Sequence, residues 1–359
     1  MVLWLRERFK WMGAHSGYDE LFATIAAVQP GNYASAWRDP HQPKSKMQKQ
    51  LLDRIVRGAL VSSFYNYDST AAELSVLWQC FKSRHELVHV AYVETCLGIL
   101  PRFKASRRFK LVGTVHQPSS WWRLLHPHPK GICDLDALIV LSQSEVRYFE
   151  QFLPNQVYCI PHGVDTDFFH PKVDPKPASD YPRCIFSGAW LRDLDTLERV
   201  IAQVLAQDPG IQFDMIVPRS NRNQPAFHRL AQYEQVFWHA GISDEQLRDL
   251  YQRASCILLP FLNSTANNAL LEAIACGLPV VTNQVGGTPD YTHPTFAHLH
   301  PVGDIDSMTA SVLQVVGNQQ QQQLMGVKAR AFAEQHFRWD YIAKKTLEVY
   351  SQLLSNTGA

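Results

Sequence analysis

Short apolar segments alternate with amphipathic ones along most of the chain. The apolar runs have the length of buried strands and occupy residues 87–92, 110–115, 137–141, 157–160, 183–186, 213–217, 255–259 and 279–282. The segments between them have helical spacing. Several begin with a capping pattern, namely Ser142 with Glu145, Asp195 with Glu198, and Ser243 with Gln246. Strands that alternate with helices in this way predict a parallel α/β architecture.

A proline-rich segment interrupts the alternation near the middle of the chain. Residues 170–182 hold four prolines and no apolar periodicity, which indicates a linker. A chain of 359 residues is long enough for two domains that each bury a core. We therefore expect an N-terminal α/β domain over residues 1–171, a linker over 172–182, a second α/β domain over 183–335, and a final helical segment over 336–359.

Composition excludes several classes of protein. A hydrophobic content of 46% is typical of a globular chain, and a formal net charge of +1 lacks the basic bias of a nucleic-acid binder. No apolar stretch approaches the ~18 residues of a membrane span, and the first residues, MVLWLRERFKWMG, lack the pattern of a secretory signal. The seven cysteines form no CxxC pair, which favours reduced thiols. We expect a soluble, cytoplasmic protein without a nucleic-acid partner.

Residues 258–291 carry the strongest chemical signal. An apolar strand leads into a loop with Ser264 and Thr265 as candidate caps, and a helix follows from about Asn267 to Gly277. The first turn of such a helix presents backbone N–H groups and positive dipole charge to a phosphate. Glu272 lies about one turn into the helix, where its carboxylate can accept two hydrogen bonds from a sugar diol. Taken alone, Glu272 is equally well explained as a solvated helix residue.

The string ALLEAIACGLPVVTNQVGG (residues 269–287) resembles the donor-site signature of glycosyltransferase family 4, which comprises retaining, nucleotide-sugar-dependent enzymes. Residues 135–171, 237–260 and 336–354 resemble further segments of that family in the same order. The resemblance implies the GT-B fold, in which two Rossmann-like parallel α/β domains face a central cleft. It also implies that the C-terminal helix returns to the N-terminal domain.

The family signature contains two glutamates with seven residues between them. Glu272 matches the second, which implies a role in binding the ribose of the donor, whereas Ser264 stands at the first position. Ser264 forms hydrogen bonds without charge, so its replacement of a glutamate bears mainly on the identity of the donor sugar. The resemblance places the donor phosphates at the start of the intervening helix, beside Asn267, Asn268, Ala269 and Leu270.

A second departure concerns the cations that hold the diphosphate. The family opens its C-terminal domain with a strand, Gly-Arg and a later Lys. In this chain Gly188 matches the glycine, Ala189 replaces the arginine, and Arg192 is the natural replacement for the lysine. Arginine suits bidentate phosphate contacts. A surface arginine at a helix start is the alternative interpretation, which the helix dipole disfavours unless an anion is near.

Two N-terminal features complete the expected site. Gly13, Ser16 and Gly17 follow an apolar strand and precede a helix for which Ser16 and Asp19 are candidate caps, and the glycines permit close approach to a phosphate or sugar. A plain turn explains the same residues. His116 ends a strand, and the resemblance implies that it contacts the donor sugar, although a lone histidine also suits a structural role.

Two other patterns have competing explanations. Asp-x-Asp occurs four times, and such a pair can hold Mn²⁺ or Mg²⁺ on a diphosphate in the rival GT-A fold. Because the pairs suit turns and helix caps, we expect no metal site and no cofactor. Residues 101–110 hold five cations and no acid, a face that suits the inner surface of an anionic membrane. A solvated basic helix face is the simpler explanation.

These observations predict a retaining hexosyltransferase that moves a sugar from a UDP- or GDP-sugar to an unidentified glycan, lipid or small molecule. Arg192, His116 and Ser264 are the expected catalytic residues. A catalytically inactive relative that binds a nucleotide or glycan as a partner subunit is the alternative. A sugar phosphorylase or an epimerase on the same fold is a third possibility.

Overall fold

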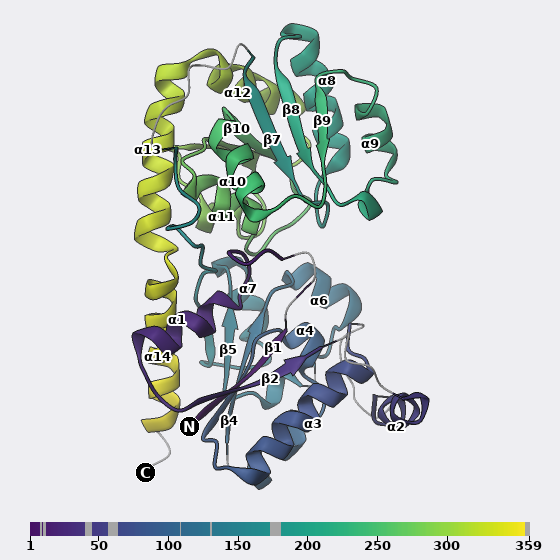
Figure 1. The fold of residues 1–359 in the computed structure, drawn as a ribbon, viewed down its shortest axis with the longest axis vertical. Helices are drawn as coiled ribbons and strands as arrows, with labels where there is room; N and C mark the ends of the chain where they lie inside the picture. Colours follow the sequence, from purple (N-terminus) through teal and green to yellow (C-terminus); the bar gives the residue numbers. More distant parts are fainter. Residues whose placement is uncertain are drawn as a thin grey trace. The chain divides into compact units, whose positions relative to one another are not determined.

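The computed structural model describes residues 1–7, 9, 12–39, 45–56, 64–107, 109–129, 131–172 and 181–355. The chain divides into two compact units. Unit 1 contains Met1–Met12, Gly17–His162 and Trp339–Ala359, and unit 2 contains Gly13–Ser16 and Gly163–Arg338. Each unit holds one six-stranded parallel sheet, which confirms the predicted α/β class (Figure 1).

Unit 1 has the strand order β2-β1-β3-β4-β5-β6. The strands are β1 (Val2–Glu7), β2 (Tyr33–Arg38), β3 (Leu87–Val90), β4 (Lys110–Val115), β5 (Ala137–Val140) and β6 (Val157–Cys159). The helices are α1 (Glu20–Val28), α2 (Lys46–Val56), α3 (Tyr67–Lys82), α4 (Val93–Cys96), α5 (Leu100–Arg107), α6 (Ser119–Leu125), α7 (Gln143–Phe149) and α14 (Trp339–Ser355). Strands β3 and β5 are buried along their whole length, as expected for parallel strands covered on both faces.

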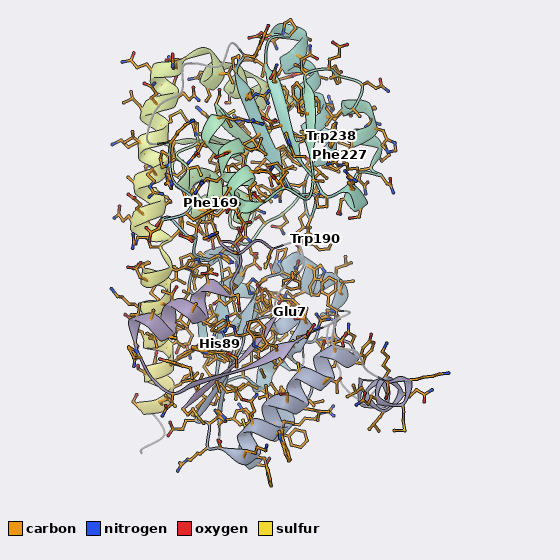
Figure 2. The ribbon with its side chains drawn as sticks, in the orientation of Figure 1. Glu7, His89, Phe169, Trp190, Phe227 and Trp238 are labelled. Carbon is orange, nitrogen blue, oxygen red and sulfur yellow. The ribbon has the colours of Figure 1, made fainter. Side chains whose placement is uncertain are left out.

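The last helix, α14, packs against α1 within unit 1. A buried histidine of the sheet forms a hydrogen bond with this helix. His89 in β3, labelled in Figure 2, shares a 2.6 Å hydrogen bond through Nδ1 with the Tyr350 hydroxyl and a 2.8 Å bond through Nε2 with Thr114. Burial lowers the pKa of His89 to about 3, so the ring stays neutral. A polar network of this kind specifies one position for α14.

Unit 2 has the strand order β12-β11-β10-β7-β8-β9. The strands are β7 (Arg183–Ser187), β8 (Gln212–Ile216), β9 (Val236–His239), β10 (Cys256–Leu259), β11 (Val280–Asn283) and β12 (Ala297–His300). The helices are α8 (Leu194–Gln207), α9 (Pro225–Leu230), α10 (Asp244–Arg253), α11 (Asn268–Ala275), α12 (Ile305–Gly317) and α13 (Gln319–His336). Helix α8 packs against α9 and α12, whereas α11 packs against α10 and α13.

The boundary between the units differs from the expected one. It falls at His162 and Gly163 because the segment after it packs on unit 2. The Val164 amide donates to the Phe337 carbonyl at 2.8 Å, and Phe169 is buried in the core of unit 2. Most of the expected linker over 172–182 lies outside the described residues.

Helix ends test the expected capping patterns directly. Ser243 and Gln246 form the predicted capping box of α10. The prediction for α8 was wrong, because its N-cap is Asp193, whose carboxylate accepts from the Thr196 amide. Ser142 precedes α7 without capping it through its side chain.

Two glycines allow α11 and α13 to approach closely. Gly277 has φ +76° and ends α11 in a Schellman arrangement, in which its amide donates to Ile274 and the Leu278 amide donates to Ala273. A Cβ atom at Gly326 in α13 would lie 2.5 Å from the Gly277 carbonyl oxygen. The contact therefore requires a glycine inside a helix, against helix propensity.

We predict that Gly326→Ala lowers the free energy of unfolding by about 1–3 kcal/mol, because the added methyl group displaces backbone. The control is Gly317→Ala at the end of α12, where a Cβ atom would meet nothing within 4 Å. Urea unfolding of both variants checks this. A Gly326→Ala protein as stable as the control would contradict the prediction.

Candidate functional site

The start of α11 forms the centre of the candidate site in unit 2. The helix follows β10, and Asn267 caps it by accepting from the Leu270 amide at 3.2 Å. The sequence suggested Ser264 and Thr265 as caps of this helix, and that prediction was wrong. The Leu270 amide, expected to face a phosphate, is used by this cap, while Asn268 and Ala269 supply the other residues of the first turn. The same Asn267 oxygen accepts from Arg192.

Arg192 is a buried cation, with 6% of its surface exposed. Its guanidinium donates to the Ser187 carbonyl at 3.0 and 2.8 Å, to the Trp190 carbonyl at 3.2 Å, and to Asn267 Oδ1 at 3.2 Å. It also lies over the Phe261 ring, 4.4 Å from the centroid. All of these partners are neutral, and burial lowers the pKa of Arg192 to about 9. An anion bound here would stabilise the charged form.

The turn between β7 and α8 holds Arg192 in place. Gly188 has φ +88°, and a Cβ atom there would lie 2.9 Å from Arg192 Nη2, so the predicted glycine is needed for both conformation and space. Leu191 has φ +54°, an uncommon conformation for a branched side chain. Trp190, in the same turn and labelled in Figure 2, is 57% exposed. Strain of this kind occurs where local geometry serves a function.

Glu272 is buried and uses both carboxyl oxygens. Oε1 accepts from the Ser16 hydroxyl at 2.6 Å, and Oε2 accepts from the Tyr251 hydroxyl at 3.0 Å. Burial raises the pKa of Glu272 to about 7. Glu272 is therefore no solvated helix residue. Tyr251, in α10, was missed by sequence reasoning because its spacing is that of an ordinary core residue.

The loop Gly13–Ser16 belongs to unit 2 and contacts it at further points besides the bond from Ser16 to Glu272. The Ala14 amide donates to Asp244 Oδ2 at 2.6 Å, and His15 Nδ1 shares a 2.8 Å hydrogen bond with Asp165 Oδ2. The His15 ring also stacks on Phe168 at 3.7 Å. Gly13 has no room for a side chain, since a Cβ atom there would lie 1.8 Å from Asp244 Oδ1.

The expected helix caps beside this loop are confirmed only in part. Asp19 occupies the N-cap position of α1, but its side chain makes no capping hydrogen bond, and its carboxylate accepts from Arg6 at 2.6 Å. Ser16 does not cap the helix, and its hydroxyl donates to Glu272. Gly17, which belongs to unit 1, has φ +106° and packs against Met12. This positive φ is by itself a sufficient reason for a glycine at position 17, so no ligand is needed to account for it.

Ser264 is buried at the ends of β10 and β11. Its carbonyl accepts from the Gly287 amide at 2.7 Å, and its amide donates to Asn263 Oδ1 at 2.8 Å. Gly286 has φ +52°, and a Cβ atom there would lie 2.2 Å from the Ser264 carbonyl oxygen. The loop after β10, which contains Ser264, and the loop after β11, which contains Gly286, are thus held together by backbone contacts at the carboxyl edge of the sheet. The role of the Ser264 hydroxyl stays a prediction.

His116 lies in unit 1, directly after β4. Its Nε2 shares a 2.9 Å hydrogen bond with the Ala91 carbonyl, and its ring stacks on Tyr92 at 4.2 Å. Burial lowers the pKa of His116 to about 3, so the imidazole is neutral and donates through Nε2. Its backbone amide donates to Glu94 at 2.6 Å. Sequence reasoning missed Glu94 because nothing in the spacing distinguishes it from a surface carboxylate.

The Asp-x-Asp pairs have structural roles. Asp136 bonds to Lys104 and to the Leu111 amide, Asp165 bonds to His15, and Asp193 and Asp304 cap helices α8 and α12. Among the described residues, no three His, Cys, Asp or Glu side chains are grouped so that they could hold a metal ion. The expectation of a reaction without metal stays a prediction.

The basic segment 101–110 is partly internal. Lys104 and Lys110 both pair with Asp136, at 3.3 and 3.6 Å, and Phe109 is buried in the core of unit 1. Arg108 lies outside the described residues. In the described part of the chain, no helix combines the length and the apolar character needed to cross a bilayer. The predicted contact with an anionic membrane stays a prediction.

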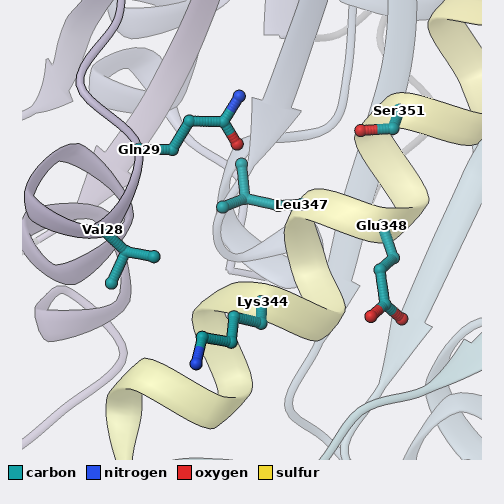
Figure 3. Close-up of a pocket in the computed structure, with 6 residues that line it drawn as sticks. All are labelled: Val28, Gln29, Lys344, Leu347, Glu348 and Ser351. Atoms are coloured by element: carbon teal, nitrogen blue, oxygen red, sulfur yellow. The ribbon is translucent and has the colours of Figure 1, made fainter.

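A groove of about 560 Å³ lies between the end of α1 and α14 in unit 1 (Figure 3). Its lining consists of Val28, Gln29, Lys344, Leu347, Glu348 and Ser351. None of the predicted site residues contributes to it.

Comparison with known protein families agrees with this geometry. Residues 33–168 match the family described as Glycosyltransferase Family 4, and residues 181–318 match the one described as Glycosyl transferases group 1. Two six-stranded parallel sheets and these two matches define a GT-B glycosyltransferase. The chain is thus similar to glycosyltransferase family 4 over most of its length, which confirms the resemblance that its donor-site signature had indicated.

Two curated relatives illustrate the range of the similarity. The MMP α-(1→4)-mannosyltransferase of Mycolicibacterium hassiacum is 24% identical over 75% of this chain and 72% of its own length. The gpi3 subunit of the phosphatidylinositol N-acetylglucosaminyltransferase of Schizosaccharomyces pombe is 26% identical over 56% of this chain, and the match spans 45% of that protein.

Solved structures share the fold over almost the whole chain. The sucrose-phosphate synthase of Thermosynechococcus elongatus has a TM-score of 0.70 and 17% identity, and the match covers 99% of both chains. HepE of Anabaena, solved in complex with UDP and glucose, has a TM-score of 0.72 and 14% identity, with 98% of this chain and 99% of that chain covered. These likenesses establish the fold.

We predict that Glu272 makes the protein less stable as pH rises from about 4.5 to about 7. The folded state keeps the Glu272 proton over this range while the unfolded state loses it, because burial raises the pKa from 4.5 to about 7. Glu272→Gln has no such proton to lose. The free energy of unfolding of this variant should therefore fall less between about pH 4.5 and pH 7 than that of wild type, by about 1–3 kcal/mol. Urea unfolding at several pH values measures the difference.

The control is Glu334→Gln, which removes an exposed carboxylate that pairs with Arg330. Equal pH slopes for wild type and Glu272→Gln would contradict the assignment.

Proposed function

We propose that this glycosyltransferase transfers a sugar from a nucleoside diphosphate sugar to an acceptor hydroxyl with retention of anomeric configuration. The observation that carries the proposal is the buried Arg192 guanidinium, whose hydrogen bonds all go to neutral oxygens. Burying a cation without a counterion is unfavourable, and a diphosphate at the start of α11 would supply that counterion.

The leaving group of such a reaction needs positive charge around it. When the bond between the anomeric carbon and the β-phosphate oxygen breaks, negative charge develops on that phosphate. Arg192 and the first-turn amides at Asn268 and Ala269 are fixed on the scaffold before the reaction, so they would stabilise this charge without rearranging. The acceptor oxygen forms the new bond on the same face, and the departing phosphate takes the acceptor's proton.

Glu272 would hold the ribose of the nucleotide. Its two oxygens accept from Ser16 and Tyr251 in the ligand-free protein, so the carboxyl group is already oriented by two hydroxyl donors. Ribose hydroxyls offer the same donor chemistry and would replace the Ser16 hydroxyl at Oε1. Within unit 2, the Ser264 hydroxyl would contact the donor sugar.

The base of the donor is proposed as uracil, with guanine as the alternative. HepE was solved with UDP and glucose, which supports UDP, whereas another relative, from Corynebacterium glutamicum, is named a GDP-mannose-dependent mannosyltransferase. Both nucleotides present the same diphosphate and ribose to Arg192 and Glu272. The two therefore differ only in contacts to the base.

We predict that Arg192→Ala lowers donor turnover by about 10²–10³-fold, the loss typical of one preorganised donor at a developing oxyanion. A panel of UDP- and GDP-sugars, with mass spectrometry of the released nucleotide, measures turnover. The control is Arg229→Ala, which removes a half-exposed arginine of α9 that pairs with Glu198 of α8.

Circular dichroism and thermal unfolding show whether Arg192→Ala keeps its fold, and Arg192→Lys keeps a charge without the planar fork. Undiminished turnover in a folded Arg192→Ala protein would overturn the assignment. Nucleotide binding by wild type without turnover of any donor would instead favour a catalytically inactive partner subunit.

We also predict that turnover persists in excess EDTA. The proposed charge stabilisation comes from Arg192 and backbone amides, so chelation removes none of it. The same mass-spectrometric assay, with and without added Mn²⁺, provides the measurement. Loss of activity in EDTA that Mn²⁺ restores would contradict this part of the proposal.

A further inference from the structure

The carboxyl group of Glu272 is covered in this structure. Glu272 is 5% exposed, and each of its oxygens accepts a hydrogen bond, Oε1 from the Ser16 hydroxyl and Oε2 from the Tyr251 hydroxyl. A ligand hydroxyl can therefore reach this carboxyl group only by displacing one of the two donors. Tyr251 is fully buried in the core of unit 2, whereas Ser16 lies in a partly exposed loop. The loop is the part that can leave.

The loop that covers Glu272 consists of the four residues Gly13–Ser16, which belong to unit 2. The residues directly before and after it belong to unit 1. The carboxylate of Asp244, in the first turn of α10, holds the start of the loop. Its Oδ2 accepts from the Ala14 amide at 2.6 Å, and a Cβ atom at Gly13 would lie 1.8 Å from its Oδ1. The glycine thus lets the backbone approach Asp244 closely.

His15 is the side-chain anchor of the loop. Its Nδ1 shares a 2.8 Å hydrogen bond with Asp165 Oδ2. Its ring stacks on Phe168, with the centroids 3.7 Å apart and the two planes within 3° of parallel. The guanidinium of Arg248, one turn beyond the start of α10, lies over the same Phe168 ring at 4.5 Å from the centroid. These contacts hold the loop in one position.

Most of the contacts that hold the loop are close to solvent. Ala14 is exposed, and the side chains of His15 and Asp165 are 36% and 24% exposed. None of the four described loop residues is part of the hydrophobic core of unit 2. Hydrogen bonds and ion pairs near the surface contribute little each, because water offers replacement partners. The loop can therefore open without disturbing the packing of the unit.

We infer that residues 13–16 form a latch that closes Glu272 to the nucleotide, with Asp244 and His15 as the positioning residues that keep it closed. The inference rests on the proposed function in one respect, namely that Glu272 binds the ribose. The Ser16 hydroxyl occupies the place of a ribose hydroxyl at Oε1, so the latch and the nucleotide exclude one another there. The affinity of the whole protein is then the intrinsic affinity reduced by the fraction of molecules whose latch is open.

Calorimetry with UDP and GDP on the full chain tests the latch. Ser16→Ala removes the competing hydroxyl, and Asp244→Ala removes the acceptor of the Ala14 amide. We expect each variant to bind the nucleotide about 5-fold more tightly than wild type, the effect of losing one hydrogen bond from the closed state. A loop that instead contacts the bound nucleotide would make Ser16→Ala bind more weakly, so the sign of the change decides between the two roles.

Hydrogen exchange at the Ala14 amide is a second readout. The amide donates to Asp244 while the latch is closed, so we expect UDP to speed its exchange, followed by mass spectrometry of peptides that contain Ala14. A ligand that merely bound beside a closed loop would slow the exchange or leave it unchanged. In Asp244→Ala the exchange should be fast with and without UDP.

Two further variants separate the latch from a general effect on α10. Asp249→Ala removes an exposed carboxylate from the same helix and should bind UDP like wild type. Asp244→Asn keeps an oxygen that can accept from the Ala14 amide, so it should restore an affinity close to that of wild type. Thermal unfolding checks that each variant folds. Ser16→Ala, in a surface loop, keeps the test valid if Asp244→Ala does not fold.

Two results would overturn the inference: nucleotide affinity in Ser16→Ala that is equal to or below that of wild type, or exchange at Ala14 that UDP slows or leaves unchanged. Binding by Ser16→Ala and Asp244→Ala without binding by wild type would support a latch that is almost always closed. Failure of the proposed function has a different signature. Neither wild type nor any of the variants would then bind UDP or GDP, and the inference would fall with it.

Discussion

The buried guanidinium of Arg192 organises the candidate site of unit 2. One side chain bonds to the end of β7, to the turn before α8 and to the cap of α11, and it lies on the Phe261 ring beyond β10. These segments are separated in sequence, and a single cation sets their spacing. The strained turn at Gly188 and Leu191 follows from that arrangement, because the backbone must curve around the guanidinium. A group that fixes the loops of the site before any ligand arrives is preorganised in the sense that catalysis requires.

Each unit also contains a buried carboxyl group that joins distant parts of the chain. Glu272 in unit 2 and Glu94 in unit 1 are both raised in pKa to about 7 by burial, and each holds elements that are distant in sequence. Glu272 accepts hydrogen bonds from the hydroxyls of Ser16 and Tyr251, whereas Glu94 accepts one from the backbone amide directly after β4. A carboxyl group accepts hydrogen bonds at both oxygens, and when protonated it can also donate one.

Much of the fold was predictable because parallel strands buried on both faces are continuous apolar runs, as in β5 and β10. The edge strand β2, YASAWR, was not predicted, because only one of its six residues is buried and its sequence therefore contains no continuous apolar run. In the candidate site, the family signature located Asn267 and Glu272. Their partners could not be predicted: Ser16 lies 256 residues from Glu272, and Tyr251 lies 21 residues away in another helix. Spacing along a chain predicts periodic elements, but it carries no information about which side chains meet between them.

The path of the chain through the two units has a consequence for synthesis. Unit 1 is completed by α14, whose Tyr350 bonds to His89 in the third strand, 261 residues earlier. Unit 2, by contrast, is almost continuous, apart from four residues near the start. During translation the second unit can therefore reach its native contacts while the first still lacks its final helix. The six strands of the unit 1 sheet are all synthesised before β7, but the helix that joins this sheet through His89 is the last element of the chain, so unit 1 reaches its full set of contacts only after unit 2 has been synthesised.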